Sequence, residues 1–413
     1  MTTLQVDIDR LMGELETLSA FSDVPAPAVS RVVFSPHDMQ ARAWLKGLCK
    51  EAGLTVREDA IGNLFARWEG TEAGASPVGT GSHTDAIPYS GRYDGTVGVL
   101  GGLEAIRTLQ RAGVKLRRPL ELLMFTSEEP TRWGIGCLGS RLLAGAISLE
   151  KVAGLRDGEK QSVEEVRSRV GFAGDLAKTK LPENYYSAFV ELHIEQGPLL
   201  EAEKIAIGVV KAIAAPSSLR IKLDGEGGHA GAVLMPVRHD ALCAAAEITL
   251  LVENAARNSG GADSVGTTGV LRVHPGAINS IPSKCELEID IRDIVLERRD
   301  AMVAKVKAGT EEICARRGVK FTIEMINADP PCTCDPAIVS AAIAASEAIG
   351  VKPKVMVSRA YHDSLFMSRL CPTGMIFIPC LKGVSHRPDE YSSPEEIRRG
   401  VEVLARTMAT LAT

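Results

Sequence analysis

Along the 413-residue chain, stretches with apolar residues at helical spacing alternate with short apolar runs typical of strands. Apolar residues at helical spacing predict a helix over residues 35–52, and near-continuous apolar runs predict buried strands over 78–83 and 120–126. A strand that is apolar throughout is typical of a sheet covered on both faces. The first half of the chain therefore predicts an α/β sheet domain.

The pattern changes between about residues 210 and 329. Strictly alternating stretches predict half-buried strands, and two longer stretches predict helices; the strands are expected over 218–223, 267–273, 284–291 and 319–325, and the helices over 238–257 and 297–317. Two helices on about four strands describe a small α+β sandwich. The predicted organisation is a larger domain of residues 1–210 and 330–413, with a mixed sheet, interrupted by a smaller domain of residues 211–329.

Two stretches of the larger domain have no clear period. Residues 148–186 are charged and irregular, which predicts a surface excursion, and residues 81–95 are rich in Pro and Gly, which predicts a tight turn. The last helix is better marked, because Ser393 can cap it, Pro394 suits its first turn, and two glutamates complement its dipole.

Charge and cysteine content narrow the class of protein. The net charge is −5, and Lys and Arg form no runs, so neither nucleic acid nor an anionic membrane is an expected partner. Nine cysteines without a C-x-x-C pair fit a reduced compartment. No apolar run reaches the roughly 20 residues that cross a bilayer, and the N-terminus reads as an amphipathic helix rather than a signal. These features predict a soluble, cytoplasmic protein.

Histidines and carboxylates recur where predicted strands end. His83 and His193 end two apolar runs, His386 follows a third, and Glu128-Glu129 follow a fourth. Each alone is more often an ordinary polar group, since a His and an Asp in a turn cap and hydrogen-bond, and adjacent acids are typical of a solvated loop. Their shared position favours a ligand crevice at the carboxyl edge of the sheet, where a cation would offset neighbouring carboxylates.

Six motifs extend this interpretation over nearly the whole chain. They are GSHTDAIPYSGRYDG, FTSEEPTRWG, ELHIEQGP, GEGGHAG, HPGAINSIP followed by DIRD, and GVSHRPDEY. In this order they resemble the hydantoinase/carbamoylase family of amidases, within the co-catalytic metallo-aminoacylases and carboxypeptidases. The resemblance implies a catalytic α/β domain interrupted by a lid domain that also forms a homodimer.

The resemblance also implies the site residues and the cofactor. Two divalent ions per subunit are expected, with manganese favoured and zinc, cobalt or nickel compatible with the same ligands. His83 and His193 would bind one ion, Glu129 and His386 the other, and Asp94 would bridge both. Glu128 would be the general base, with His229 as an oxyanion donor and Asp85 orienting the His83 ring. The implied substrate contacts are Gln196, His229, Asn279, Arg292, Tyr361 and His362; His37, His239 and His274 are expected to be structural or solvated.

Two segments of the chain narrow the expected substrate within those hydrolysed by the family. Its members hydrolyse N-carbamoyl amino acids, ureidopropionate, allantoate and ureidoglycolate, and the segments SRAYHDS and AIPYSGRYDG look most like those of ureidoglycolate amidohydrolases. We therefore expect a small ureido acid as substrate, with N-carbamoyl-L-amino acids or allantoate as alternatives. A protein of another class, a catalytically silent relative that binds a carboxylate or a partner protein, stays open; metal analysis with an activity test separates it from the enzyme.

Overall fold

A computed structural model describes residues 4–413 of the chain. The chain forms two compact units. The larger, here called the sheet unit, comprises the described part of Met1–Lys211 together with Cys334–Met356 and His362–Thr413. The smaller, the inserted unit, comprises Ala212–Thr333 and also Val357–Tyr361, a return of the chain that the sequence pattern did not predict.

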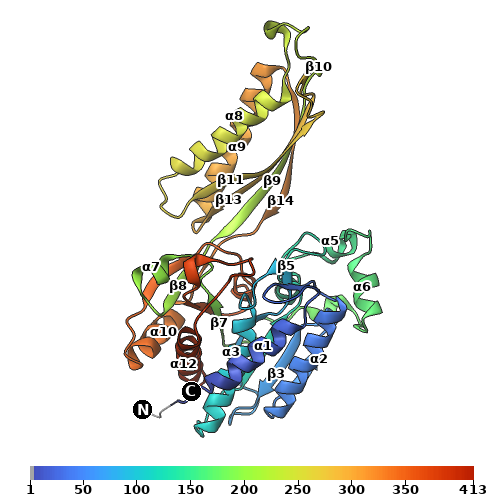
Figure 1. Ribbon diagram of the computed structural model, residues 1–413. Helices are drawn as coiled ribbons and strands as arrows, with labels where there is room; N and C mark the ends of the chain where they lie inside the picture. Colours follow the sequence, from blue (N-terminus) through green and yellow to red (C-terminus); the bar gives the residue numbers. More distant parts are fainter. Residues whose placement is uncertain (1–3) are drawn as a thin grey trace. The chain divides into compact units, whose positions relative to one another are not determined.

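The sheet unit is built on a mixed nine-stranded sheet with the path β15-β8-β17-β7-β4-β6-β3-β2 and with β16 paired to β8 (Figure 1). Strands β17, β7, β4 and β6 are parallel neighbours, whereas β8 joins β17 and β3 joins β6 antiparallel. The predicted α/β class with a mixed sheet is confirmed. The strands are β2 (Thr55–Glu58), β3 (Leu64–Trp68), β4 (Val78–His83), β6 (Leu120–Phe125), β7 (Ala188–Ile194), β8 (Gly208–Ile213), β15 (Cys332–Thr333), β16 (Lys354–Ser358) and β17 (Thr373–Ile378).

Helices cover both faces of this sheet, because its central strands are apolar on both sides. Leu122 of β6 and Val190 of β7 belong to one core with α1, α2, α3, α10 and α12, whereas Leu123 and Phe189 belong to a second core with α4 and α11. The helices are α1 (Ile8–Ala20), α2 (Pro36–Glu51), α3 (Thr96–Arg111), α4 (Leu138–Ala144), α5 (Leu149–Gly154), α6 (Val163–Arg169), α7 (Leu199–Glu203), α10 (Pro336–Ala348), α11 (Ser364–Met367) and α12 (Pro394–Ala412). None within residues 4–413 is long and apolar enough to cross a membrane.

Two predictions for the sheet unit were wrong. The stretch 148–186 contains α5, α6 and a 3₁₀ turn at Leu176–Thr179, and its apolar residues, including Val163 and Phe172, are buried in a small core with Phe34. The stretch 81–95 is more than a turn, because Ala86–Ser90 forms β5, which pairs antiparallel with β1 (Val29–Arg31).

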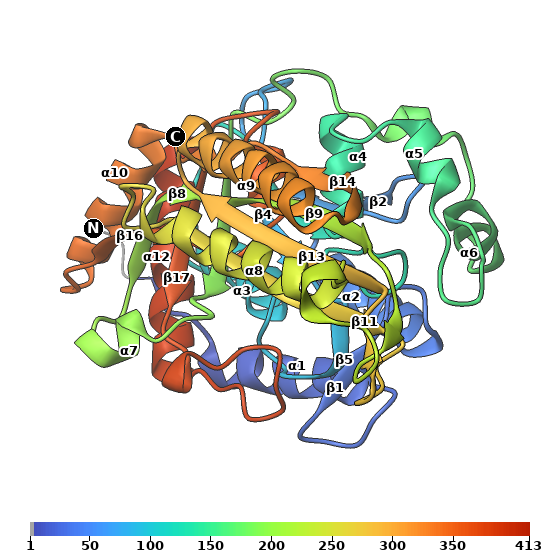
Figure 2. The same ribbon diagram turned by 90° about the horizontal axis from the view of Figure 1, so that it is seen from above.

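The inserted unit is a two-layer α+β structure. Its four antiparallel strands have the order β11-β13-β9-β14, and α8 and α9 lie side by side over one face of them (Figure 2). Inward-facing residues of the strands, such as Ile221 and Leu287, form its core with both helices. The elements are β9 (Ala215–Asp224), β10 (Gly228–His229), α8 (Ala241–Arg257), β11 (Val265–His274), β12 (Ser280–Ile281), β13 (Lys284–Asp293), α9 (Leu296–Arg317) and β14 (Lys320–Ala328), with a 3₁₀ turn at Met235–Val237.

Candidate metal centre

The parallel strands of the sheet unit bring the predicted ligands to one edge. His83 is the last residue of β4 and lies opposite Phe125, the last residue of β6; His193 in β7 lies opposite Phe377 in β17. Since the carboxyl ends of parallel strands meet at the same edge, the segments that follow β6 and β17 also start there. These segments carry Glu129 and His386.

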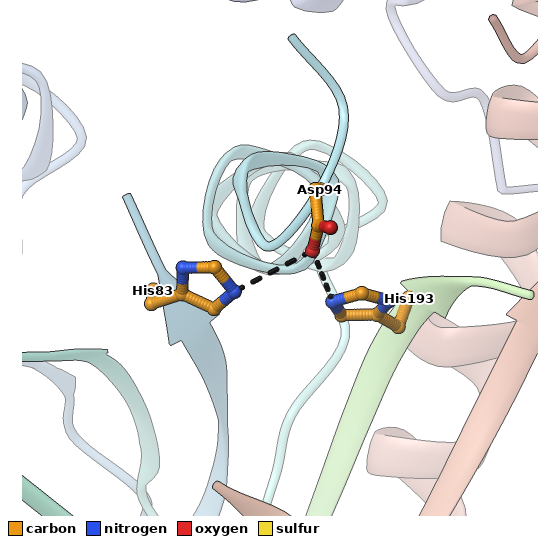
Figure 3. Close-up of side chains that lie close together, drawn as sticks. All are labelled: His83, Asp94 and His193. Atoms are coloured by element: carbon orange, nitrogen blue, oxygen red, sulfur yellow. Dashed lines mark ion pairs between the residues drawn. The ribbon is translucent and has the colours of Figure 1, made fainter. Parts of the chain in front are cut away.

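A first group of candidate ligands surrounds one oxygen of Asp94. Nε2 of His83 lies 3.6 Å from Oδ1 of Asp94, and Nε2 of His193 lies 3.2 Å from the same oxygen. Figure 3 shows the two rings, carried by β4 and β7, pointing at the carboxylate from either side. All three side chains are buried, and their ligand atoms lie within 4.8 Å of one another.

A second group uses the other oxygen of the same carboxylate. Nε2 of His386 lies 3.2 Å from Oδ2 of Asp94 and 3.3 Å from Oε1 of Glu129. This group is open to solvent at His386, because the side chain of His386 is 46% exposed whereas that of Glu129 is 4% exposed. Asp94 therefore has one oxygen in each group, the arrangement expected of a carboxylate that bridges two cations.

Main-chain groups fix the orientation of both buried imidazoles. Nδ1 of His83 lies 2.9 Å from the carbonyl oxygen of Asp85, and Nδ1 of His193 lies 2.9 Å from that of Ile194. A carbonyl only accepts, so Nδ1 carries the proton in each ring, and Nε2 offers its lone pair to the group around Asp94. Gly95 allows this approach: its φ is 68°, and a Cβ there would lie 2.4 Å from Nε2 of His83.

Asp85 acts on this site through both its main chain and its side chain. The ring of His83 contacts the carbonyl of Asp85 rather than its carboxylate, whose Oδ1 lies 3.8 Å from Nδ1. The carboxylate instead accepts hydrogen bonds from the amides of Glu128 and Glu129, at 3.2 and 3.1 Å. The prediction that the carboxylate of Asp85 orients His83 was therefore wrong: the main-chain carbonyl does so, and the carboxylate aligns both glutamates.

Burial and charge distinguish the carboxylates. Burial alone would raise the pKa of Asp94, but the surrounding imidazoles of His193, His386 and His83 hold it well below its usual value. Burial raises the pKa of Glu128 well above its usual value; His83 opposes this effect, and the nearby charge of Glu129 adds to it. Several buried carboxylates here lie close to Nε2 atoms of histidines. Such a site suits divalent cations, because each cation offsets the repulsion between neighbouring carboxylates.

Three further residues support the Asp94 carboxylate. Gln196 and Ser385 each donate a hydrogen bond of 2.7 Å to Oδ2 of Asp94, and the buried carboxylate of Glu390 accepts from the amides of Tyr93 and Asp94. Gln196 was predicted as a substrate contact, and its buried Oε1 has no hydrogen-bond partner within residues 4–413. Ser385 and Glu390 were missed, although both stand in the GVSHRPDEY motif.

Comparison with known proteins identifies the family to which the residues of this site belong. The sequence profile of peptidase family M20/M25/M40 matches residues 79–410, a span that contains every residue of both groups. The chain belongs to peptidase family M20/M25/M40.

Within this M20 family, the similarity extends over the full chain. The ureidoglycolate hydrolase of Oryza sativa subsp. japonica is 53% identical over 98% of this chain and 85% of its own length. The crystal structure of AtUAH in complex with (S)-hydroxyglycine is 52% identical, covers 99% of this chain and 98% of that one, and has a TM-score of 0.89. A hydantoinase/carbamoylase family amidase from Burkholderia multivorans is 36% identical over 99% and 98% of the two chains, with a TM-score of 0.89. The predicted family resemblance is confirmed.

Three further residues, predicted from the resemblance to hydantoinase/carbamoylase amidases, lie in the inserted unit: His229, Asn279 and Arg292. His229 and Asn279 are exposed on two adjoining segments, since the amide of Ala230 donates to the carbonyl of Asn279 at 2.9 Å. The amide of Gly231 donates to Nδ1 of His229, so the neutral ring carries its proton on Nε2, as an oxyanion donor requires.

Arg292, in β13, already holds one carboxylate. Its Nε and Nη2 donate to Asp290 at 2.8 and 3.1 Å, and its Nη1 donates to the carbonyl of Arg359 at 2.9 Å. A guanidinium has five N–H groups, so one on each terminal nitrogen is left for another ligand.

The predicted contacts at 361 and 362 belong to different units. Tyr361, in the inserted unit, donates its hydroxyl proton to the carboxylate of Asp329. His362, in the sheet unit, is buried, with its ring centroid 4.6 Å from that of His193. His362, His193 and Glu191 form a third cluster of possible ligands, but both oxygens of Glu191 accept hydrogen bonds from serines, which fits a structural carboxylate.

Proposed function

We propose that this chain is a dinuclear metal-dependent amidohydrolase that hydrolyses the ureido group of ureidoglycolate, with release of ammonia and CO2. One observation carries the metal centre: the two oxygens of Asp94 face two separate groups of ligands. The substrate rests on similarity, because the rice relative that is 53% identical is a ureidoglycolate hydrolase.

The residues present fit two divalent ions. His83 and His193 would hold one, Glu129 and His386 the other, and Asp94 both; manganese is favoured, and zinc, cobalt or nickel suit the same donors. Such a pair of ions, when bound, polarises a carbonyl and lowers the pKa of water towards about 7. Glu128 would accept a proton from the attacking water and pass it to the leaving nitrogen.

The proposed substrate contacts are polar groups. Gln196 offers its unpartnered Oε1, His229 an N–H for the developing oxyanion, and Arg292 its two remaining terminal N–H groups for the substrate carboxylate. Asn279, Tyr361 and His362 complete the proposed contacts. The buried position of His362 beside His193 suits a residue that orients substrate next to the metal ligands.

A homodimer formed through the inserted unit is part of the proposal. Apolar side chains that a monomer would leave in water are exposed on the segments around β10 and β12: Leu234, Met235, Val237 and Ile278. Burying them against a second copy would be favourable. The inserted unit would then act as both lid and dimerisation domain, and the sheet unit as the catalytic domain.

A parallel assay tests the substrate. Ammonia release from ureidoglycolate, allantoate and several N-carbamoyl-L-amino acids should be measured with manganese-loaded protein at equal enzyme concentration. We expect the highest kcat/KM with ureidoglycolate. A higher value with an N-carbamoyl amino acid or allantoate would reassign the substrate within the family. Bound metal without turnover of any substrate would favour the catalytically silent alternative.

A further inference from the structure

Cys137 occupies a position where a glycine would be more stable. It precedes α4 with φ 56° and ψ 34°, in the left-handed region, which disfavours any side chain except that of glycine. The chain does place glycines close by, at Gly136 and Gly139, where a Cβ would lie 2.7 Å from the carbonyl of Glu128 and 2.1 Å from Oδ1 of Asn63. A side chain kept in a strained backbone at a functional site suggests that it is used.

Cys137 is attached to Glu128 at two points. Its amide donates to the main-chain carbonyl of Glu128 at 2.7 Å, and its thiol donates to Oε1 of the same residue at 3.3 Å. The amides of Leu138 and Gly139 continue this pairing to the carbonyls of Ser127 and Thr126. The segment before α4 is therefore fixed in register with the segment that carries Glu128.

The thiol makes the two oxygens of Glu128 different. Oε1 receives the S–H bond, and Oε2 lies 3.7 Å from Nε2 of His83, on the side of the first ligand group. Cys137 is completely buried, and both burial and the charge of Glu128 raise the pKa of its thiol well above the usual value. The sulfur therefore keeps its proton and remains a donor.

We propose that Cys137 is a positioning residue that holds the Glu128 carboxylate by its thiol, so that Oε2 faces the reacting water. The inference rests on the proposed function only in taking Glu128 as the general base. Without the thiol, the carboxylate can rotate about its last bond, which lowers the fraction of molecules with the base in place. The effect should appear in kcat rather than in KM.

Three variants test this role in the metal-loaded enzyme. Cys137→Ala removes the donor and should lower kcat on the order of tenfold, with KM and bound metal unchanged. Cys137→Ser restores an O–H donor and should return kcat to within about threefold of the unmodified enzyme. The matched control is Cys371→Ala, which removes another buried thiol, one that contacts a main-chain carbonyl 3.7 Å away, and should leave kcat unchanged. A normal kcat in Cys137→Ala, or equal losses in the Ala and Ser variants, would overturn the proposal.

A spectroscopic measurement tests the contact without turnover. The Raman S–H stretching band of Cys137 is isolated as the difference between the unmodified protein and Cys137→Ser. In the metal-loaded protein, where the nearby cations favour the ionised form of Glu128, this band should lie at lower wavenumber than that of a free thiol. Glu128→Gln should raise it, because a neutral acceptor binds the proton less strongly. A band that Glu128→Gln does not move would refute the contact. If no ureido substrate is hydrolysed, the proposed function fails while this band still decides the contact.

Discussion

Glu128 and Glu129 are neighbours in sequence with different surroundings, and one pair of substitutions should separate their roles. Oε1 of Glu129 lies 3.3 Å from Nε2 of His386, within the second ligand group. Glu128 belongs to neither ligand group built on Asp94, and its Oε2 faces His83 at 3.7 Å. Glutamine keeps the shape of each side chain and removes its charge.

The expected losses differ in kind. In Glu128→Gln the proton acceptor is lost, and general acid–base catalysis is worth about 10²–10⁴-fold in rate, or about 3–5 kcal/mol of activation free energy. Both ions should stay bound, and added metal should not restore turnover. In Glu129→Gln a charged ligand is lost. Since even outer partners of metal ligands are worth about 10–100-fold in affinity, we expect one ion to bind more than about 100-fold more weakly.

Both variants should be titrated with manganese while bound ions and ammonia release are measured. Glu121→Gln is the matched control: Glu121 is buried in β6, the strand that leads to the two glutamates, and accepts hydrogen bonds from Arg67 and Tyr186. Its folded fraction should bind two ions. Rescue of Glu128→Gln by excess metal, with no metal loss in Glu129→Gln, would reverse the assignment; full activity in both variants would refute this site.

Three other substitutions probe the bridge, the substrate carboxylate and the fold. Asp94→Ala should abolish binding of both ions, because each loses a shared anionic ligand; a full complement by metal analysis would contradict the bridge. Arg292→Lys should weaken kcat/KM by about 1–3 kcal/mol, since an ammonium has no planar fork, and unchanged kinetics would exclude the contact. Ser393→Ala should lower the free energy of unfolding by about 0.5–2 kcal/mol in urea titrations, because its hydroxyl caps α12 at the amide of Glu396; an unchanged midpoint would show that the cap adds nothing.

Elements with strong local signals were predictable from sequence. The apolar run 78–83 is β4 over the same residues, and the cap at Ser393 begins α12, where Glu396 completes a capping box. By contrast, α5 and α6 have six and seven residues, which is too few turns to show a helical period. Strand β5 depends on pairing with β1, more than fifty residues earlier in the chain, and local sequence contains no sign of that partner.

The same distinction holds at the site. The candidate ligand residues stand out because histidines and acids follow apolar runs, a pattern visible along the chain. Their supporting contacts are not visible in this way, since Ser385 reaches Asp94 across 291 positions and Glu390 reaches the amide of Tyr93 across 297. Cys137 is close to Glu128 in sequence, but the contact of its thiol with Glu128 depends on a left-handed backbone at residue 137. A single cysteine in the sequence does not indicate that conformation.

The position of β17 has a consequence for how the protein is made on the ribosome. This strand is the last of the large sheet to be synthesised, yet it lies between β7 and β8. A nascent chain that has not reached Thr373 leaves the edge of β7 without its partner, and it also lacks His386. His83, Asp94 and His193 can come together before that point. The second group of candidate ligands is incomplete until the chain has passed the last strand, because it includes His386. Chains stalled before β17 should therefore expose an unpaired apolar strand and rely on chaperones until the centre of the sheet is filled.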